Sequence, residues 1–155
     1  MGTIRLNAIG YVQNDRKVLA DDHWGDVISE IYLDEALPEE CLDGIETFSH
    51  AEVIFHFDRV AEEMDVLRAR HPRGNKDWPQ VGIFAQRNKD RPNHLGSTMV
   101  RIVRRERRSL FVAGLDAVDG TPVLDIKPVF AEYLPREPIR QPEWVHELMK
   151  DYWNE

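Results

Sequence analysis

The sequence predicts a mainly β fold, a small closed or partly open β-barrel with short helices and a C-terminal helix. Short runs rich in β-branched and aromatic residues recur along the chain, with turn-forming residues between them. A long helical pattern is found only near the end of the chain. Many short strands of this kind are typical of a barrel or a sandwich. Strands are expected at residues 3–12, 27–33, 52–57, 81–86, 98–104, 110–115 and 123–126.

The clearest hairpin joins the expected strands 98–104 and 110–115. The alternation of apolar residues stops at Arg105 and resumes after Arg108, which predicts an exposed tip rich in arginine. A short helical turn is expected over 38–44, because a proline can begin it and a glycine can end it. Residues 61–70 are a candidate for a further helix.

The strongest helical pattern covers residues 142–153, where Pro142 can open a helix. Its apolar side chains recur at helical spacing and share one face. These side chains are Trp144, Val145, Leu148, Met149 and Tyr152. Packing of this face against the barrel is the favoured interpretation, and a contact between two subunits is the alternative.

A single domain over residues 1–155 is expected, with the barrel core over 3–130, because 155 residues suffice for one substantial core. One cysteine, Cys41, cannot form an internal disulfide, and no histidine or cysteine spacing indicates a zinc site. The sequence has no apolar stretch of membrane-spanning length and opens without the pattern of a signal peptide. A cytoplasmic protein without a membrane span is therefore expected.

Charge is distributed unevenly along the chain, whose net charge is -8. Residues 68–108 contain many arginines and lysines but only three acids, Asp77, Asp90 and Glu106. One interpretation is a solvated hairpin whose arginines pair with acidic neighbours. The other is a polyanion surface, and this basic segment is the candidate contact for tRNA.

Two segments have the composition of binding loops. In the first, over 82–97, Pro92 restricts the backbone of Arg91, and Gly96 permits a close approach. Arg87, Asn93 and Ser97 can supply directed hydrogen bonds to a carboxylate, a ribose or a base.

The second segment, over 114–128, contains the strong turn sequence of Asp119 and Gly120, after which Thr121 and Pro122 restart an extended run. It is either an ordinary turn between strands or a site that presents backbone N–H and C=O groups to an adenine. In the second case, Asp119 would reach a ribose hydroxyl.

Metal and hydrolase chemistry receive little support. His50 and His56 lie on one face of a strand, but six residues of strand separate them by ~20 Å. The carboxylates of Asp116, Asp119 and Asp125 have no spacing that brings them together. No metal ligand is assigned.

Several blocks of the sequence resemble the TsaA-like (YaeB) family, and they occur in the family's order over about residues 9–129. The blocks are Ile9-Gly10, Leu42-Asp-Gly-Ile-Glu-Thr-Phe-Ser-His50, Gly82-Ile-Phe-Ala-Gln-Arg87, Arg91-Pro-Asn-His-Leu-Gly96 and Asp116-Ala-Val-Asp-Gly-Thr-Pro-Val-Leu-Asp-Ile-Lys-Pro128. The resemblance implies a homodimeric β-barrel methyltransferase with S-adenosylmethionine near the subunit junction. It also implies N6-methylation of threonylcarbamoyl-adenosine beside the anticodon of tRNA.

Residues are carried over from the family by position. The cofactor-binding positions are His23, Trp24, Gly25, Asp58, Arg59, Arg87, Ser97, Asp119, Gly120, Thr121 and Pro122. The positions that shape the loops or contact substrate are Arg91, Asn93, Gly96 and Lys127. The chain departs from the family at Gln86, Asn88, His94 and Val129, and it has Asp58-Arg59 and His23-Trp24-Gly25 where the family has His-Gln and Gln-Pro-Gly.

Methyl transfer from a sulfonium requires that the two reactants are oriented and that water is excluded. An amide-like nitrogen also needs a general base, for which Asp58, His23 and Asp125 are candidates. Two alternatives are an S-adenosylmethionine-binding protein without turnover and a methyltransferase acting on a small molecule or another non-tRNA substrate. A metal-dependent hydrolase is a third.

Overall fold

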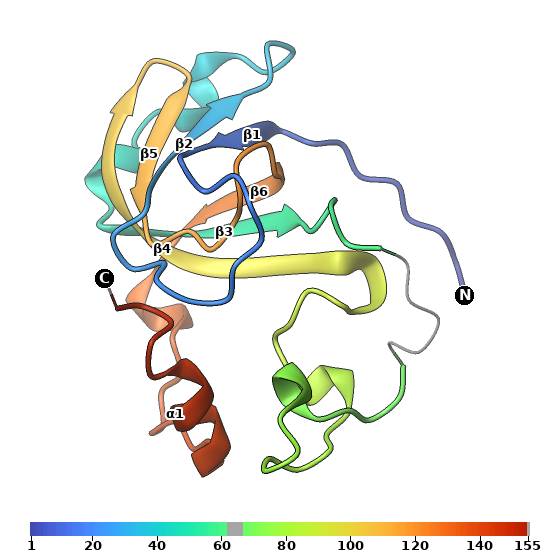
Figure 1. Ribbon diagram of the computed structural model, residues 1–155. Helices are drawn as coiled ribbons and strands as arrows, with labels where there is room; N and C mark the ends of the chain where they lie inside the picture. The colour runs from blue at the N-terminus through green and yellow to red at the C-terminus, as the bar shows by residue number, and fades with distance from the viewer. Residues whose placement is uncertain (62–66, 155) are drawn as a thin grey trace.

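The computed structural model describes residues 1–61 and 67–154 and shows a closed antiparallel barrel (Figure 1). The strands are β1 (Gly10–Gln13), β2 (Ile28–Leu33), β3 (His50–His56), β4 (Leu95–Glu106), β5 (Ser109–Ala113) and β6 (Pro122–Pro128). Around the barrel they follow the order β1-β2-β5-β4-β3-β6, and β6 closes it by pairing with β1. The prediction of a mainly β barrel is confirmed.

The helical elements are short. Within residues 1–61 and 67–154, the single α-helix is α1 (Glu143–Met149). The 3-10 turns are η1 (Glu39–Leu42), η2 (Ile45–Thr47), η3 (Pro72–Gly74), η4 (Ile83–Ala85), η5 (Pro92–His94) and η6 (Ala131–Tyr133). The expected helical turn over 38–44 corresponds to η1, and Gly44 follows it with a positive φ of 86°.

The core follows from the alternation of side chains along each strand. In β3, Ala51, Val53 and Phe55 are buried, while the residues between them are more exposed. Gly96 on β4 lies opposite Phe55, and a Cβ at this position would overlap the phenyl ring. The barrel interior therefore requires glycine here, which explains the Gly96 of the sequence block 91–96.

The hairpin of β4 and β5 forms as expected. Its register shifts between Ile102 and Arg104, and Arg107 at the tip has a positive φ of 53°. Strand β4 has 12 residues, pairs with β5 up to Glu106 and leads into the arginine-rich tip.

Three elements differ from expectation. Of residues 3–12, only residues 10–12 lie in a strand, β1, which continues to Gln13. Ile9 alone of the preceding residues bonds to β6, through its N–H and the Val123 carbonyl oxygen. Residues 81–86 form η4 and one bridge from Val81 to Arg70, because the Ala85 and Gln86 N–H groups bond back to the Gly82 and Ile83 carbonyl oxygens and close a helical turn. Of the helix expected over 61–70, residues 62–66 lie outside the described part of the chain, and residues 67–70 form a turn, a bend and the bridge from Arg70 to Val81, so no helix forms there.

The C-terminal helix is shorter than expected. It ends at Met149, and residues 150–152 form a turn. Trp144 contacts Trp78 with ring centroids 6.3 Å apart, and the Trp78 indole donates to the Glu147 carboxylate at 2.7 Å. Helix α1 thus packs beside the segment 71–94, on the same side of the barrel (Figure 1). In the described residues, no helix is long and apolar enough to cross a membrane.

Candidate functional site

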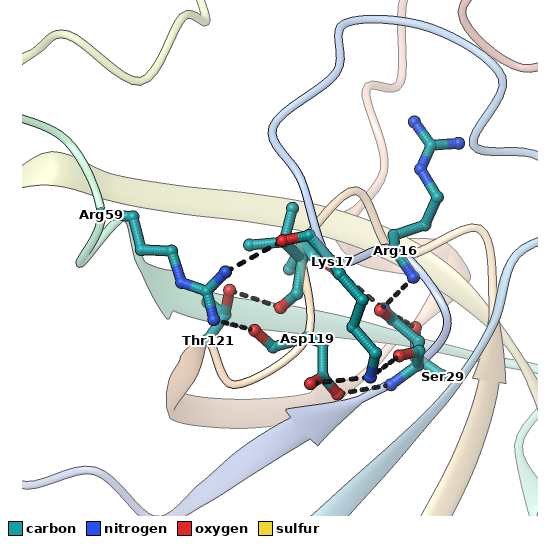
Figure 2. Close-up of polar contacts among 9 residues, drawn as sticks. Arg16, Lys17, Ser29, Arg59, Asp119 and Thr121 are labelled. Atoms are coloured by element: carbon teal, nitrogen blue, oxygen red, sulfur yellow. Dashed lines mark hydrogen bonds and ion pairs between the residues drawn. The ribbon is translucent and has the colours of Figure 1, made fainter.

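The turn before β6 is built around the carboxylate of Asp119. One oxygen accepts a hydrogen bond from the Asn14 backbone N–H at 3.0 Å, and the other pairs with Lys17 Nζ at 2.8 Å (Figure 2). The Lys17 ammonium, together with the Asn14 N–H, lowers the pKa of the Asp119 carboxyl below its usual range. Asp119 is therefore an anion at neutral pH.

Arg59 ties this turn to the end of β3. Its Nη2 donates to the Asp119 carbonyl oxygen at 2.7 Å and its Nη1 to the Lys17 carbonyl oxygen at 3.1 Å (Figure 2). Gly120 has a positive φ of 85°, and a Cβ there would lie 3.1 Å from Arg59 Nη2. The structure thus brings Arg59 into contact with Asp119 and Gly120, about 60 residues later in the chain.

The backbone N–H groups of the turn are already satisfied. Asp119 donates to the Arg16 carbonyl oxygen, Gly120 to that of Val12 and Thr121 to that of Val118. The Thr121 hydroxyl also donates to Val118 at 2.7 Å. The expectation that this turn presents free N–H groups to an adenine is wrong, because closing the barrel against β1 uses them.

Sequence analysis missed the loop after β1. The Asn14 amide donates to the Ser29 hydroxyl at 2.8 Å and to the Ala117 carbonyl oxygen at 2.9 Å. Arg16 donates to the His23 carbonyl oxygen at 2.8 Å, and its guanidinium lies 4.0 Å from the centroid of the Trp24 ring. These residues carry no motif, and their partners are remote in sequence, so no local signal indicates them.

Arg87 and Ser97 form a second group. Arg87 Nη2 donates to the Ser97 carbonyl oxygen at 2.5 Å, and the Ser97 hydroxyl donates to Glu52 at 2.6 Å. Ser97 pairs with Ile54, which in turn pairs with Asp125 of β6, so this group lies two strands away from β6. Among the described residues, no hydrogen bond or ion pair joins Arg87 to the turn at Asp119.

A hollow of about 630 Å³ lies between the two segments that the family resemblance singles out. Asn93 and Leu95 contribute one wall, and Pro122 and Leu124 contribute another. His56 and the N-terminal residues Gly2, Thr3, Ile4, Leu6 and Ala8 complete its lining. The loop of 91–96 and the start of β6 therefore share one hollow, whose lining is polar and apolar in similar measure.

Residues 23–25 contact the chain's own C-terminal segment. His23 and Trp24 donate their backbone N–H groups to the carbonyl oxygens of Asp151 and Tyr152, and the His23 ring lies 3.3 Å from the Asn154 carbonyl oxygen. A Cβ at Gly25 would overlap the carbonyl oxygen of Trp153. Trp24 is 3% exposed. This loop is joined to the Asp119 turn only indirectly, through Arg16.

Beside this segment, Asp116 accepts hydrogen bonds from the hydroxyls of Thr98 and Tyr152. Burial, followed by the Asp116 charge and hydrogen bond, raises the pKa of the Tyr152 hydroxyl, while Arg73 and Arg87 oppose the rise. Tyr152 is therefore a neutral donor that fastens the C-terminal segment to the barrel end. The helical pattern had suggested only that its ring packs.

The remaining loop residues have structural partners. Arg91 Nη1 donates to the Gln86 carbonyl oxygen at 2.8 Å, and Asn93 has a positive φ of 63°. Gln86 and Asn88, which depart from the family pattern, bond to each other at 2.8 Å. His94 also has a positive φ, of 48°. Two of the residues that differ from the family pattern thus hydrogen-bond to each other within the loop.

The three candidate bases differ in their surroundings. The Asp125 carboxylate pairs with Lys127, and His23 Nδ1 faces the Asn154 carbonyl oxygen. Asp58 is exposed, and no hydrogen bond or ion pair of its carboxylate is found among the described residues. Nor do those residues include a cluster of histidines, cysteines and acids that could hold a metal ion.

Residues 21–134 match the family model for the tRNA-methyltransferase O N-terminal domain. The human tRNA (adenine(37)-N6)-methyltransferase is 35% identical over 105 residues, which are 68% of this chain but 23% of that protein. The "Probable S-adenosyl-L-methionine-binding protein" of Methanothermobacter thermautotrophicus is 35% identical over 135 residues, 83% of this chain and 92% of that protein.

Solved structures agree with the sequence matches. A crystal structure of TrmO from Pseudomonas aeruginosa superposes with a TM-score of 0.73 at 26% identity, covering 93% of this chain and 62% of that chain. This chain thus spans less than a quarter of the human relative and under two thirds of the bacterial TrmO chain. On the family match and on the relative that it nearly covers, the chain belongs to the family of the tRNA-methyltransferase O N-terminal domain, the TsaA-like family.

Proposed function

We propose that this protein is an S-adenosylmethionine-dependent methyltransferase that modifies N6 of an adenosine in tRNA. In the more specific form of the proposal, this adenosine is threonylcarbamoyl-adenosine. The observation that carries the proposal is the hollow shared by the 91–96 loop and the start of β6, which follows the turn where ionised Asp119 meets cationic Arg59. The Asp119 side chain itself lines a second hollow, together with Lys17 and Gly120. The names of the human and mouse relatives supply the reaction class.

The chemistry of the hollow fits the cofactor. A nucleoside pocket of this kind needs apolar walls, a few directed polar groups and roughly 300–1,000 Å³ of space. Leu95, Pro122 and Leu124 supply apolar walls, and Asn93 supplies an amide within a volume of about 630 Å³. Arg87, beside this loop, makes no ion pair with a described residue, so its charge is available to a carboxylate.

The cofactor would supply a methyl group on a positively charged sulfur. We assign Arg87 to its carboxylate and the Asp119 side chain to a ribose hydroxyl. Since the N–H groups of the turn are occupied, recognition of the adenine there would use carbonyl oxygens, with Asn93 as the directed donor. Ser97, Thr121 and Pro122 act by holding these groups in place.

Of the three candidate general bases, the surroundings favour Asp58. Its carboxylate is exposed without a described partner, whereas Asp125 is neutralised by Lys127. Asp58 precedes Arg59, which is anchored to the Asp119 turn. Asp58 would accept the proton that the acceptor nitrogen loses during methyl transfer.

The basic segment 68–108 divides into two parts. At the hairpin tip, Arg105 pairs with Asp43 at 2.7 Å, Arg107 with Glu39 at 3.7 Å and Arg104 with Glu106 at 2.5 Å. By contrast, Lys76 and Lys89 make no ion pair with any described residue, although Arg73 of the same segment pairs with Asp22 at 2.9 Å. The tRNA phosphates would therefore contact the 71–94 segment more than the hairpin tip.

We extend the proposal to a cytoplasmic homodimer. The N-terminal residues Ile4 and Leu6 are strongly exposed where they line the hollow. A second subunit covering them would remove apolar surface from water and close the cavity.

The first test is cofactor binding. S-adenosylmethionine at millimolar concentration should raise the melting temperature of the protein, and Arg87→Ala should remove most of that shift. Arg107→Ala, which changes an arginine at the paired hairpin tip, is the matched control and should retain it. Absence of a shift in the wild type would contradict the proposal.

The second test is turnover with labelled cofactor on tRNA that carries threonylcarbamoyl-adenosine. Methyl incorporation should be lost in Asp58→Asn while the thermal shift persists. Binding without transfer to tRNA would favour the second candidate function, an S-adenosylmethionine-binding protein or a small-molecule methyltransferase. The name of the archaeal relative, which specifies binding alone, supports that candidate.

A further inference from the structure

We propose that Phe84 is a stacking platform for an unpaired RNA base, positioned by the same segment that carries the unpaired cations. This inference rests on the proposed function insofar as it takes RNA as the substrate. It adds a contact residue that lies outside the hollow and outside the cofactor positions.

The Phe84 ring is held outward by its neighbours. It is 81% exposed, whereas Ile83 before it is 4% exposed and Gln86 after it is 8% exposed. The Gln86 amide donates to the Val81 carbonyl oxygen at 2.9 Å, and the η4 turn closes through backbone bonds of Ala85 and Gln86. A buried residue on each side of the turn thus fixes the backbone that presents the ring.

An exposed phenylalanine alone is no evidence for a site, since isolated apolar side chains are common on protein surfaces. The second observation is the charge around it. Lys89 follows Phe84 by five residues, and its ammonium forms no ion pair or hydrogen bond within the described residues. Arg87, three residues after Phe84, forms no ion pair there either, but it donates to the Ser97 carbonyl oxygen at 2.5 Å. The hairpin arginines of the same basic segment are each paired with an acid or with backbone carbonyls. Uncompensated positive charge therefore accompanies the exposed ring.

A flat apolar ring on the same segment as cations that pair with no described acid matches single-stranded nucleic acid. Every base has a π-face that can stack on an aromatic side chain, and the adjoining phosphates neutralise lysine and arginine. Phenylalanine loses little conformational entropy when it stacks, because its backbone is already fixed and it has two side-chain torsions.

A second copy of the chain fits this surface less well. A symmetric contact through Phe84 would place the same patch opposite itself. Arg87 and Lys89 of the two copies would then lie near each other without described acids to offset them. Charge complementarity therefore favours RNA over self-association.

The experiment compares the Phe84→Ala, Phe84→Tyr and Tyr133→Ala variants of the full chain. Tyr133 is a matched control because its ring is 86% exposed but lies on η6, away from the basic segment in sequence. The probe is an RNA stem–loop that carries the position-37 adenosine in its loop, with affinity measured by fluorescence anisotropy. Cofactor thermal shift and sedimentation are measured in parallel.

We expect Phe84→Ala to weaken RNA binding roughly 5- to 100-fold, the range for loss of one base-stacking contact. Phe84→Tyr should restore most of the affinity, and Tyr133→Ala should leave it unchanged. The melting temperature and the cofactor shift should be those of the wild type in all three variants, which separates this contact from folding and from the cofactor site.

Three results would overturn the inference. Unchanged RNA affinity in Phe84→Ala, with RNA binding and cofactor binding intact in the wild type, refutes the stacking contact and leaves the proposed function standing. A change of oligomeric state in Phe84→Ala would identify the ring as a contact between protein chains. Failure of the wild type to bind RNA, while it still binds S-adenosylmethionine, would reject both this contact and tRNA as substrate.

Discussion

Arg59 at the end of β3 donates a hydrogen bond of 2.7 Å to the carbonyl oxygen of Asp119, 60 residues later in the chain. The same guanidinium bonds to the carbonyl oxygen of Lys17, whose ammonium pairs with the Asp119 side chain. One arginine therefore holds together the loop after β1, the end of β3 and the turn before β6. This arrangement makes the shape of the candidate site depend on a few polar contacts.

Replacement of Arg59 tests that dependence. We expect Arg59→Ala to lower the free energy of unfolding by about 1 kcal/mol, because both hydrogen bonds lie at an exposed position. It should weaken the thermal shift by S-adenosylmethionine by a larger factor, since the turn loses its orientation. Chemical denaturation and a ligand titration measure the two effects. Arg107→Ala, at a side chain 88% exposed, should change neither; equal loss of cofactor affinity in both variants would refute the role of Arg59.

Gly120 should tolerate no side chain. Its φ of 85° is unfavourable for other L-residues by roughly 1–2 kcal/mol, and a Cβ would also press on the Arg59 guanidinium. We expect Gly120→Ala to destabilise the protein by at least that range in urea denaturation. Gly82→Ala is the matched control, because its φ is -66° and nothing lies within 4 Å of its Cβ position. If the two substitutions cost the same, the conformational argument is wrong.

The ion pair of Asp119 predicts that the free energy of unfolding decreases at acid pH. Because Lys17 lowers the pKa of the folded-state carboxyl, the contribution is present above the unfolded pKa of about 3.9 and is lost as the pH falls through the lower, folded-state pKa. Unfolding free energies of the wild type and of Asp119→Asn should therefore converge below about pH 4. A constant difference between them from pH 7 to pH 2 would argue against this account.

The barrel could be predicted from sequence because inward and outward side chains alternate along each strand. Ala51, Val53 and Phe55 show the pattern plainly, and Gly96 marks the position where a strand must approach the Phe55 ring. Closure of the sheet could not be predicted with the same certainty, because it depends on the pairing of β1 with β6 through two residues, Gly10 and Tyr11. Residues 81–86 have the composition of a strand but adopt η4 instead.

The candidate site was only partly predictable. The family resemblance assigned both Arg59 and Asp119 to the cofactor-binding positions, and the structure places these two residues in contact. Asn14 and Lys17 belong to no sequence motif. Their role could not be predicted, because the partner of Asn14 lies 105 residues away in the chain. The role of Tyr152 was also hidden, because its hydroxyl finds Asp116 only after the chain turns beyond α1.

The hydrogen bond of Tyr152 should stabilise the packing of the C-terminal segment on the barrel, and this stabilisation should be lost at alkaline pH. Its folded-state pKa is raised by burial and by Asp116, so its contribution is complete below the unfolded pKa of about 10 and is lost as the pH rises further. We expect Tyr152→Phe to cost roughly 1.5–3 kcal/mol at pH 8, the range for a hydrogen bond to a charged group. The wild type should approach the variant as the pH rises above about 10. Tyr133→Phe serves as the control, and a wild type that keeps its full advantage at high pH would contradict the mechanism.

The division of the basic segment leads to a prediction about salt. Lys89 makes no ion pair with a described residue, whereas Arg105 pairs with Asp43 and donates to the Glu39 carbonyl oxygen at 3.0 Å. A cation that contacts an RNA phosphate releases counterions, and each contact adds about 0.7 to the slope of log affinity against log salt for single strands. Lys89→Ala should therefore reduce the slope by about that amount. Arg105→Ala should leave the slope unchanged while lowering the melting temperature, because its charge is already used within the fold. The reverse outcome, with the slope carried by Arg105, would place the RNA surface on the hairpin tip.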